Sequence, residues 1–155
     1  MKSIVILSLL LLIIVRPAIT LAQQPTVRQQ HFNVKENLAL QGYDPVSYFT
    51  GKPVVGKVSF RVMHKGITYQ FANSQHAEAF KASPEKYEPA YGGWCAYAMG
   101  ESGEKVKVDP ETYKIIAGRV YLFYNFWGNN TLEDWNKNEG ELKVAADRNW
   151  KKFIP

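Results

Sequence analysis

Cysteine is nearly absent from this sequence, because the 155 residues contain only one, Cys95. A single cysteine cannot form a disulfide within the chain, so the fold must be held together by its core. The thiol then has three possible fates: pairing with another molecule, reactivity as a free thiol, or burial as a small and inert hydrophobe.

Several motifs of well-known enzyme classes are also missing. The chain has no Cys-x-x-Cys, no Gly-x-Ser-x-Gly, no phosphate-binding glycine loop and no His-Glu-x-x-His. Lysines are interspersed with acidic residues, and no block of Lys and Arg forms the footprint of a nucleic-acid site. The sequence therefore argues against classical hydrolases, P-loop proteins and thioredoxin-type exchange, and it predicts no nucleic-acid partner.

Long apolar runs are limited to one, over residues 4–15, which follows Lys2 and precedes Thr20-Leu21-Ala22. This run is shorter than the roughly 20 residues that span a bilayer as a helix. A charged start, a short apolar run and a small final residue are typical of a secretory signal peptide. We therefore expect residues 1–22 to be removed on export, no stable membrane insertion, and a periplasmic or extracellular location.

The remaining pattern predicts an α+β fold. Alternating apolar residues over 57–63 and 67–71, and a further pair of apolar runs over 113–117 and 120–124, predict two β-hairpins with short glycine turns. Helical spacing follows over 74–81 and from residue 131 onward. We expect a small antiparallel sheet built from the two hairpins, with short helices and a C-terminal helical segment packed on it.

The predicted organisation is a single domain after the signal peptide. Polar, proline-containing residues at its start indicate an extended N-terminal arm over 23–40. Residues 41–128 form the main domain, in which Asp44 caps a short helix and Pro45 is its first residue. Residues 129–155 form a C-terminal helical extension of the same domain.

The candidate site centres on residues 91–97, where a glycine pair and three aromatic residues surround the cysteine. Adjacent glycines allow positive φ or a close approach of the backbone to another group. Aromatic side chains of this size can wall off a pocket. Cys95 is the candidate reactive or metal-binding thiol, and the residues predicted to bind a cofactor or ligand are Gly92, Gly93, Trp94, Tyr97 and Tyr69.

His76 is the second candidate, because it shares a helical face with the core residue Phe80. At a helix N-terminus the charged imidazole is disfavoured, which leaves a neutral ring able to bind metal or accept a proton. The alternative is a core histidine bonded to a backbone group. We expect His76 to point toward the Cys95 loop, where the two could bind a soft metal such as copper(I) or zinc, or hold a reactive thiolate.

The order of several motifs resembles a YHS domain, and in particular an exported YHS family with a later Gly-aromatic-Cys-Ala element. The resemblance covers roughly residues 41–125. It implies a metal-binding core, although Ser47 and Ala72 stand where related modules carry cysteine. It also implies redox or soft-metal chemistry at Cys95, where some family members carry selenocysteine. The matching residues are Asp44, Pro45, Val46, Tyr69, Phe71, His76, Phe80, Pro84, Tyr87, Gly93–Ala96, Asp109, Pro110 and Gly118–Leu122.

Three functions remain open at this point. The first is a binding module, not an enzyme, that takes a metal ion such as copper or a small molecule at a thiol-centred site formed by Cys95 and His76. The second is a redox enzyme or sensor in which Cys95 is the catalytic residue. The third is an interaction domain that uses its aromatic surface without chemistry. The sequence indicates neither the ligand nor the oligomeric state.

Overall fold

The computed structural model describes residues 25–154, so the predicted signal peptide lies outside the described residues. The helices and 3-10 turns are α1 (Val27–His31), η1 (Leu40–Gly42), η2 (Ser47–Phe49), α2 (Ser74–Ala82), α3 (Pro84–Tyr87), η3 (Ala90–Gly93), α4 (Ala96–Glu101), α5 (Thr131–Lys137) and α6 (Glu139–Trp150). The strands are β1 (Val34–Lys35), β2 (Leu38–Ala39), β3 (Lys57–His64), β4 (Ile67–Phe71), β5 (Asp109–Ile116), β6 (Arg119–Phe123), β7 (Asn125–Phe126) and β8 (Asn129–Asn130).

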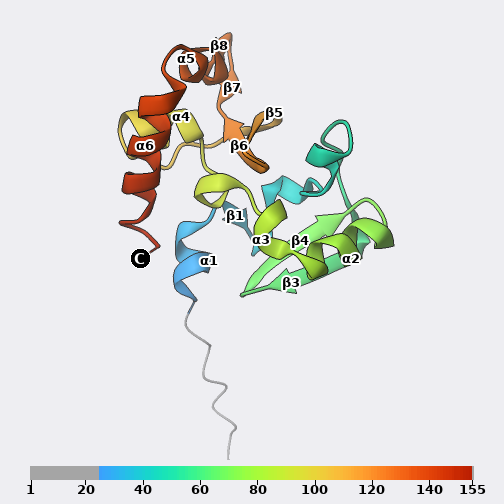
Figure 1. Ribbon diagram of the computed structural model, residues 1–155. Coiled ribbons are helices and arrows are strands. Elements are labelled where there is room, and N and C mark those ends of the chain that lie inside the picture. The colour runs from blue at the N-terminus through green and yellow to red at the C-terminus, as the bar shows by residue number, and fades with distance from the viewer. Residues whose placement is uncertain (1–24, 155) are drawn as a thin grey trace, which may run out of the picture.

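The α+β class and both predicted hairpins are confirmed. β3 pairs with β4, and β5 pairs with β6, each in the antiparallel sense. Lys65-Gly66 connects β3 to β4, and Ala117-Gly118 connects β5 to β6. All four residues have positive φ, as two-residue turns that match the strand twist require. The hairpins lie in different sheets: the first belongs to the four-stranded order β1-β2-β4-β3, and the second stands alone. Figure 1 shows them in separate parts of the molecule.

The prediction of an extended N-terminal arm is wrong for the described part of 23–40. Residues 27–31 form α1, which Thr26 and Gln29 close with a capping box. Beyond it, β1 and β2 pair with each other, and β2 runs parallel to β4. The arm is therefore part of the sheet and of the core rather than a separate extension.

The C-terminal helices cover two different elements. Trp135 of α5 lies with its ring centroid 5.9 Å from Tyr121 and 5.5 Å from Phe123, so α5 packs on β6. α6 instead packs along α4. This approach is close because Gly100 of α4 has no side chain, and a Cβ there would lie 2.5 Å from the Leu142 carbonyl oxygen. The two helices are divided at Asn138.

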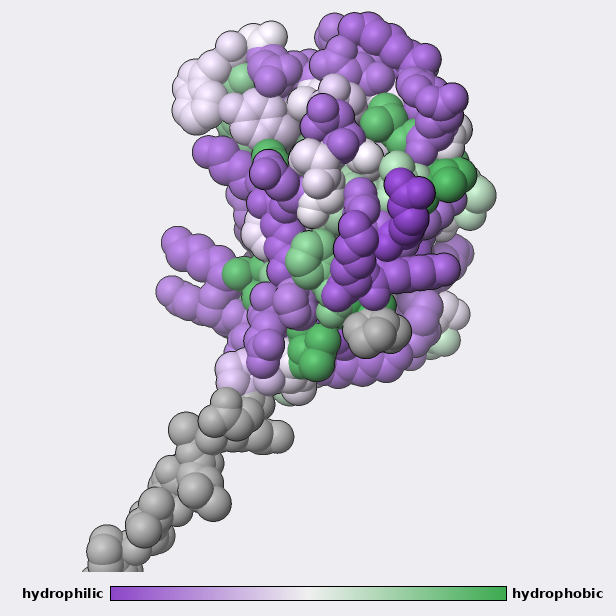
Figure 2. Space-filling view, turned by 90° about the vertical axis from the view of Figure 1, so that its left-hand side faces the viewer, coloured by the Kyte–Doolittle hydropathy of each residue, from purple (hydrophilic) through white to green (hydrophobic). Residues whose placement is uncertain are grey.

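The core consists of two adjoining groups of buried side chains. The first joins β4, α2 and β6, and it contains Phe71, Phe80, Cys95 and Leu122. The second lies between β6, α4, α5 and α6, around Trp135. On the face drawn in Figure 2, hydrophobic residues appear in small separate groups among hydrophilic ones. Among residues 25–154, no helix is both long and apolar enough to cross a membrane.

Candidate functional site

A buried carboxylate holds His76 in one orientation. Asp44 has no exposed surface, and its Oδ2 lies 2.6 Å from His76 Nδ1. The same carboxylate accepts hydrogen bonds from the backbone N–H of Val46, at 2.8 Å, and of Ala72, at 2.9 Å. These three donors come from the Asp-Pro turn, the end of β4 and the first turn of α2. Asp44 therefore connects three segments. The predicted capping role is wrong, because η2 begins at Ser47 and its N-cap is Val46.

The bond to Asp44 determines which nitrogen of His76 is available. Because the carboxylate is an acceptor, Nδ1 carries the proton, and in the neutral ring Nε2 is left with a free lone pair. Nε2 has no hydrogen-bond partner among the residues that the structure describes, and the side chain is 20% exposed. The ring therefore presents an oriented lone pair to solvent. This geometry allows metal ligation or proton acceptance at Nε2.

Cys95 is buried at the junction of the two core groups, with a relative exposure of 0%. Its Sγ accepts from the Tyr124 backbone N–H at 3.4 Å and lies 3.4 Å from Thr131 Oγ1. Since the Thr131 hydroxyl donates to the Tyr124 carbonyl at 3.0 Å, the thiol proton is the one that points to Thr131. Both hydrogen-bonding capacities of a neutral thiol are thus used internally. The backbone N–H of Cys95 also donates to Val106 O, at 2.9 Å.

The residues do not fit a copper site shared by Cys95 and His76. The hydrogen bonds of the thiol go to Thr131 and Tyr124, whereas those of the imidazole ring go to Asp44, and no described bond links the two groups. Nor do residues 25–154 contain a cluster of three or more His, Cys, Asp or Glu side chains able to hold a metal ion. A thiol-centred metal site would require Cys95 to leave the core.

The predicted cofactor-binding residues serve the core instead. Gly92 and Gly93 do adopt positive φ, at 60° and 86°. A Cβ on Gly92 would lie 2.8 Å from the rings of Phe32 and Trp150, so the space that this glycine leaves is filled by protein. Trp94 Nε1 donates to the His31 carbonyl at 2.7 Å. Tyr97 is half-buried and packs against both core groups.

Tyr69 belongs to a second buried polar group that joins α1 to the core. Its hydroxyl donates to Glu88 Oε1 at 2.5 Å, and Arg28 forms an ion pair with the same oxygen. Burial, reinforced by the Glu88 carboxylate, raises the pKa of Tyr69 far above its ordinary value, so the hydroxyl remains a donor. The Arg28 guanidinium lies 4.2 Å from the ring centroid of Phe32. The network anchors the N-terminal helix, and Tyr69 is not part of the His76 site.

The burial of Cys95 leads to a direct expectation for its reactivity. In the folded protein, reaction with the thiol reagent DTNB is expected to be slower than in 6 M guanidinium by a factor of about 10³ or more, because the reagent needs local opening to reach Sγ. Absorbance at 412 nm follows the reaction. Rapid stoichiometric labelling of the native protein would contradict this and would restore the reactive-thiol hypothesis.

The pairing of Asp44 with His76 was not predicted from the sequence. The two residues are 32 positions apart, and Asp before Pro has a sufficient local explanation as a turn residue. Glu88 was missed for a similar reason, since its partner Arg28 lies 60 positions away. One signal was available: Asp44 stands in an otherwise apolar and aromatic segment, where a carboxylate needs several donors to be buried.

Compared with known proteins, the chain matches no family model, no curated protein and no solved structure.

Proposed function

We propose that the chain is a metal-binding module in which His76 Nε2 is the protein ligand for copper or another transition-metal ion. The observation that carries this proposal is the 2.6 Å contact between His76 Nδ1 and the fully buried Asp44. Metal-binding histidines typically donate their second ring N–H to a carboxylate, which fixes the tautomer and increases the basicity of the ligating nitrogen. Imidazole nitrogen is a good ligand for copper and zinc.

The geometry favours an open site with exchangeable metal over a closed structural one. A structural zinc site normally has four protein ligands, whereas His76 supplies one and the described residues supply no cluster around it. Water or groups from a partner would complete the coordination. The proposed role is therefore transient binding of an ion, consistent with the YHS resemblance and with the expected export of the chain.

A titration of the full chain with Cu²⁺, made without a polyhistidine tag, tests this proposal. His76→Ala is expected to weaken Cu²⁺ binding by at least about tenfold, because it removes the ligand itself. Asp44→Asn is expected to weaken binding by about 10–100-fold, as the loss of an outer-shell partner typically does. Isothermal titration calorimetry measures both changes, with circular dichroism as a check that each variant is folded.

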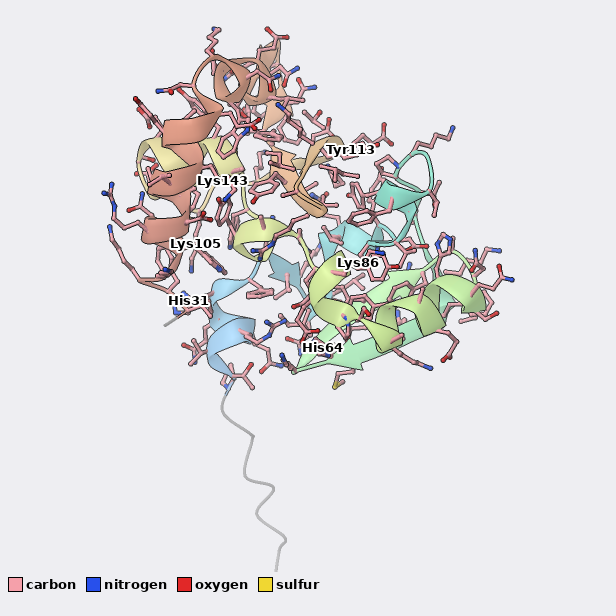
Figure 3. The ribbon with its side chains drawn as sticks, in the orientation of Figure 1. His31, His64, Lys86, Lys105, Tyr113 and Lys143 are labelled. Carbon is pink, nitrogen blue, oxygen red and sulfur yellow. The ribbon has the colours of Figure 1, made fainter. Side chains whose placement is uncertain are left out.

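Two matched variants make the result specific. His64→Gln removes another histidine. The Nε2 of His64 is buried, and its ring packs edge-on against Phe80 with the centroids 5.9 Å apart. Figure 3 shows His64 at the end of the β3–β4 hairpin that is far from the start of α2. This variant should bind like the wild type. Cys95→Ser should also leave the affinity unchanged. If Cys95→Ser abolishes binding while His76→Ala does not, the thiol-centred hypothesis replaces this one.

A further inference from the structure

Three aromatic rings gather at the β7–β8 hairpin, and they lie close to a lysine. Ring centroids of Tyr124 and Phe126 are 5.0 Å apart, those of Phe126 and Trp127 are 5.9 Å apart, and the planes are tilted by 70° and 47°. The Lys107 ammonium lies 4.9 Å from the Phe126 centroid and 5.0 Å from the Trp127 centroid. Phe126 and Trp127 thus form two walls of a V-shaped notch, with a cation at its opening.

The position of Trp127 is unfavourable in two respects, because its side chain is exposed to solvent and its backbone is left-handed. The residue is 86% exposed, the highest value among the large hydrophobic residues described. Its φ is +53°, in the left-handed region, where Asn or Gly usually precedes the glycine of such a turn. Residues held in such conformations tend to cluster at functional sites. Neither the turn nor the core requires an indole here.

Lys107 shows what kind of group the notch accepts. Its Nζ has no hydrogen-bond or ion-pair partner within residues 25–154, so apart from solvent its described neighbours are the two ring faces. Attraction between a cation and the negative face of an aromatic ring is the basis of this contact. An ammonium on a long flexible side chain is easily displaced, because its contact is exposed and hydrated.

We infer that the notch formed by Phe126, Trp127 and Tyr124 is a second binding site, for a quaternary ammonium group of the choline type. Such a cation spreads its charge over methyl groups and is poorly hydrated, so it loses less on desolvation than Lys107 does and covers more of the rings. The notch is distinct from the His76 site, since Figure 1 shows the β7–β8 hairpin far from α2. Binding here goes beyond the proposed metal-binding function.

NMR titration of the full chain with choline tests this inference. The protein has four tryptophans, and Trp127 is assigned by comparison with Trp127→Phe. Choline is expected to shift the Trp127 indole signal, whereas the neutral isostere 3,3-dimethylbutanol should bind about fivefold more weakly or worse, because it lacks the charge. Equal binding of the two compounds, or no shift with either, would overturn the proposal.

Two variants then examine the notch itself. Lys107→Ala removes the internal competitor, so choline affinity should rise about threefold, whereas a role of Lys107 in holding the ligand would lower it. Trp127→Leu keeps an apolar side chain but removes a ring face, and it should reduce affinity about fivefold or more. Lys35→Ala is the matched control and should change nothing, because Lys35 belongs to β1 in the four-stranded sheet and not to the β7–β8 pair. A Lys107→Ala variant that loses binding contradicts the proposal.

Vesicles distinguish a lipid headgroup from a free small molecule. Sedimentation with phosphatidylcholine vesicles that free choline reverses identifies the headgroup as the source, whereas a response to choline without vesicle binding identifies a soluble ligand. Both results support a quaternary ammonium site. Preferential sedimentation with phosphatidylglycerol vesicles, insensitive to choline, would show that the rings and Lys107 act as an anchor for an anionic surface, and it would overturn the inference.

Discussion

Replacing Asp44 with alanine is expected to lower the free energy of unfolding by about 3–5 kcal/mol. The carboxylate is fully buried and satisfies three donors, which are the backbone N–H groups of Val46 and Ala72 and the ring N–H of His76. Each donor that loses its partner in a buried place costs about 1–3 kcal/mol. Urea unfolding followed by tryptophan fluorescence measures the change.

Two further variants provide the comparison for this prediction. Asp44→Asn keeps the shape of the side chain and one acceptor oxygen, so the loss should be smaller, about 1–3 kcal/mol. Asp134→Ala removes a carboxylate that is 41% exposed and pairs with Lys137 on the surface, and it should cost about 1 kcal/mol or less. If Asp44→Ala costs no more than Asp134→Ala, the buried network does not hold the three segments together.

Replacing Gly100 with alanine is expected to destabilise the protein by about 1–3 kcal/mol, the usual range for overpacking a well-packed contact. The added Cβ would lie 2.5 Å from the Leu142 carbonyl oxygen and 3.2 Å from its Cα. Both atoms belong to the backbone of α6, so they cannot move out of the way as a flexible side chain would. The two helices would have to separate, which would open the core around Trp135.

Gly140→Ala is the matched control, because it is the same substitution in the partner helix. Apart from its two chain neighbours and the backbone of α6, no atom lies within 4 Å of the Cβ position at Gly140, and alanine is favoured over glycine in a helix by up to about 1 kcal/mol. This variant should therefore be stabilised, with a higher urea midpoint. Thermal or urea unfolding of both variants measures the contrast. Equal effects of the two substitutions would mean that α4 and α6 do not depend on the small residue between them.

The parts of the fold that could be predicted are those encoded by near neighbours. The first hairpin follows from alternating apolar residues and the second from two apolar runs, each pair separated by a short turn whose glycine has the expected positive φ. The division into separate sheets was not predictable, because it depends on which strands meet across long stretches of chain. The parallel pairing of β2 with β4 shows this, since it joins Leu38 to Thr68.

The candidate site was predictable only in part, for the same reason. The helical face of His76 follows from its spacing to Phe80, but the choice of Asp44 as its partner depends on the tertiary fold. The glycine pair has the backbone conformation expected from its composition. The glycine pair does not line a binding space as predicted, because the space beside Gly92 is filled by the side chains of Phe32 and Trp150. The exposure of Cys95 likewise depends on the elements that cover it, and a local pattern carries no information about them.

The anchoring of α1 also determines when this helix can form. Five residues are too few for a helix that is stable by itself in water. Its support comes from Glu88, which pairs with Arg28 60 positions away, and from Trp94 and Lys105, which bond to His31 across 63 and 74 positions. Figure 3 shows His31 beside Lys105. The helix α1 therefore forms only once residues 88–105 have taken up their places, so its order reports the folding of that segment.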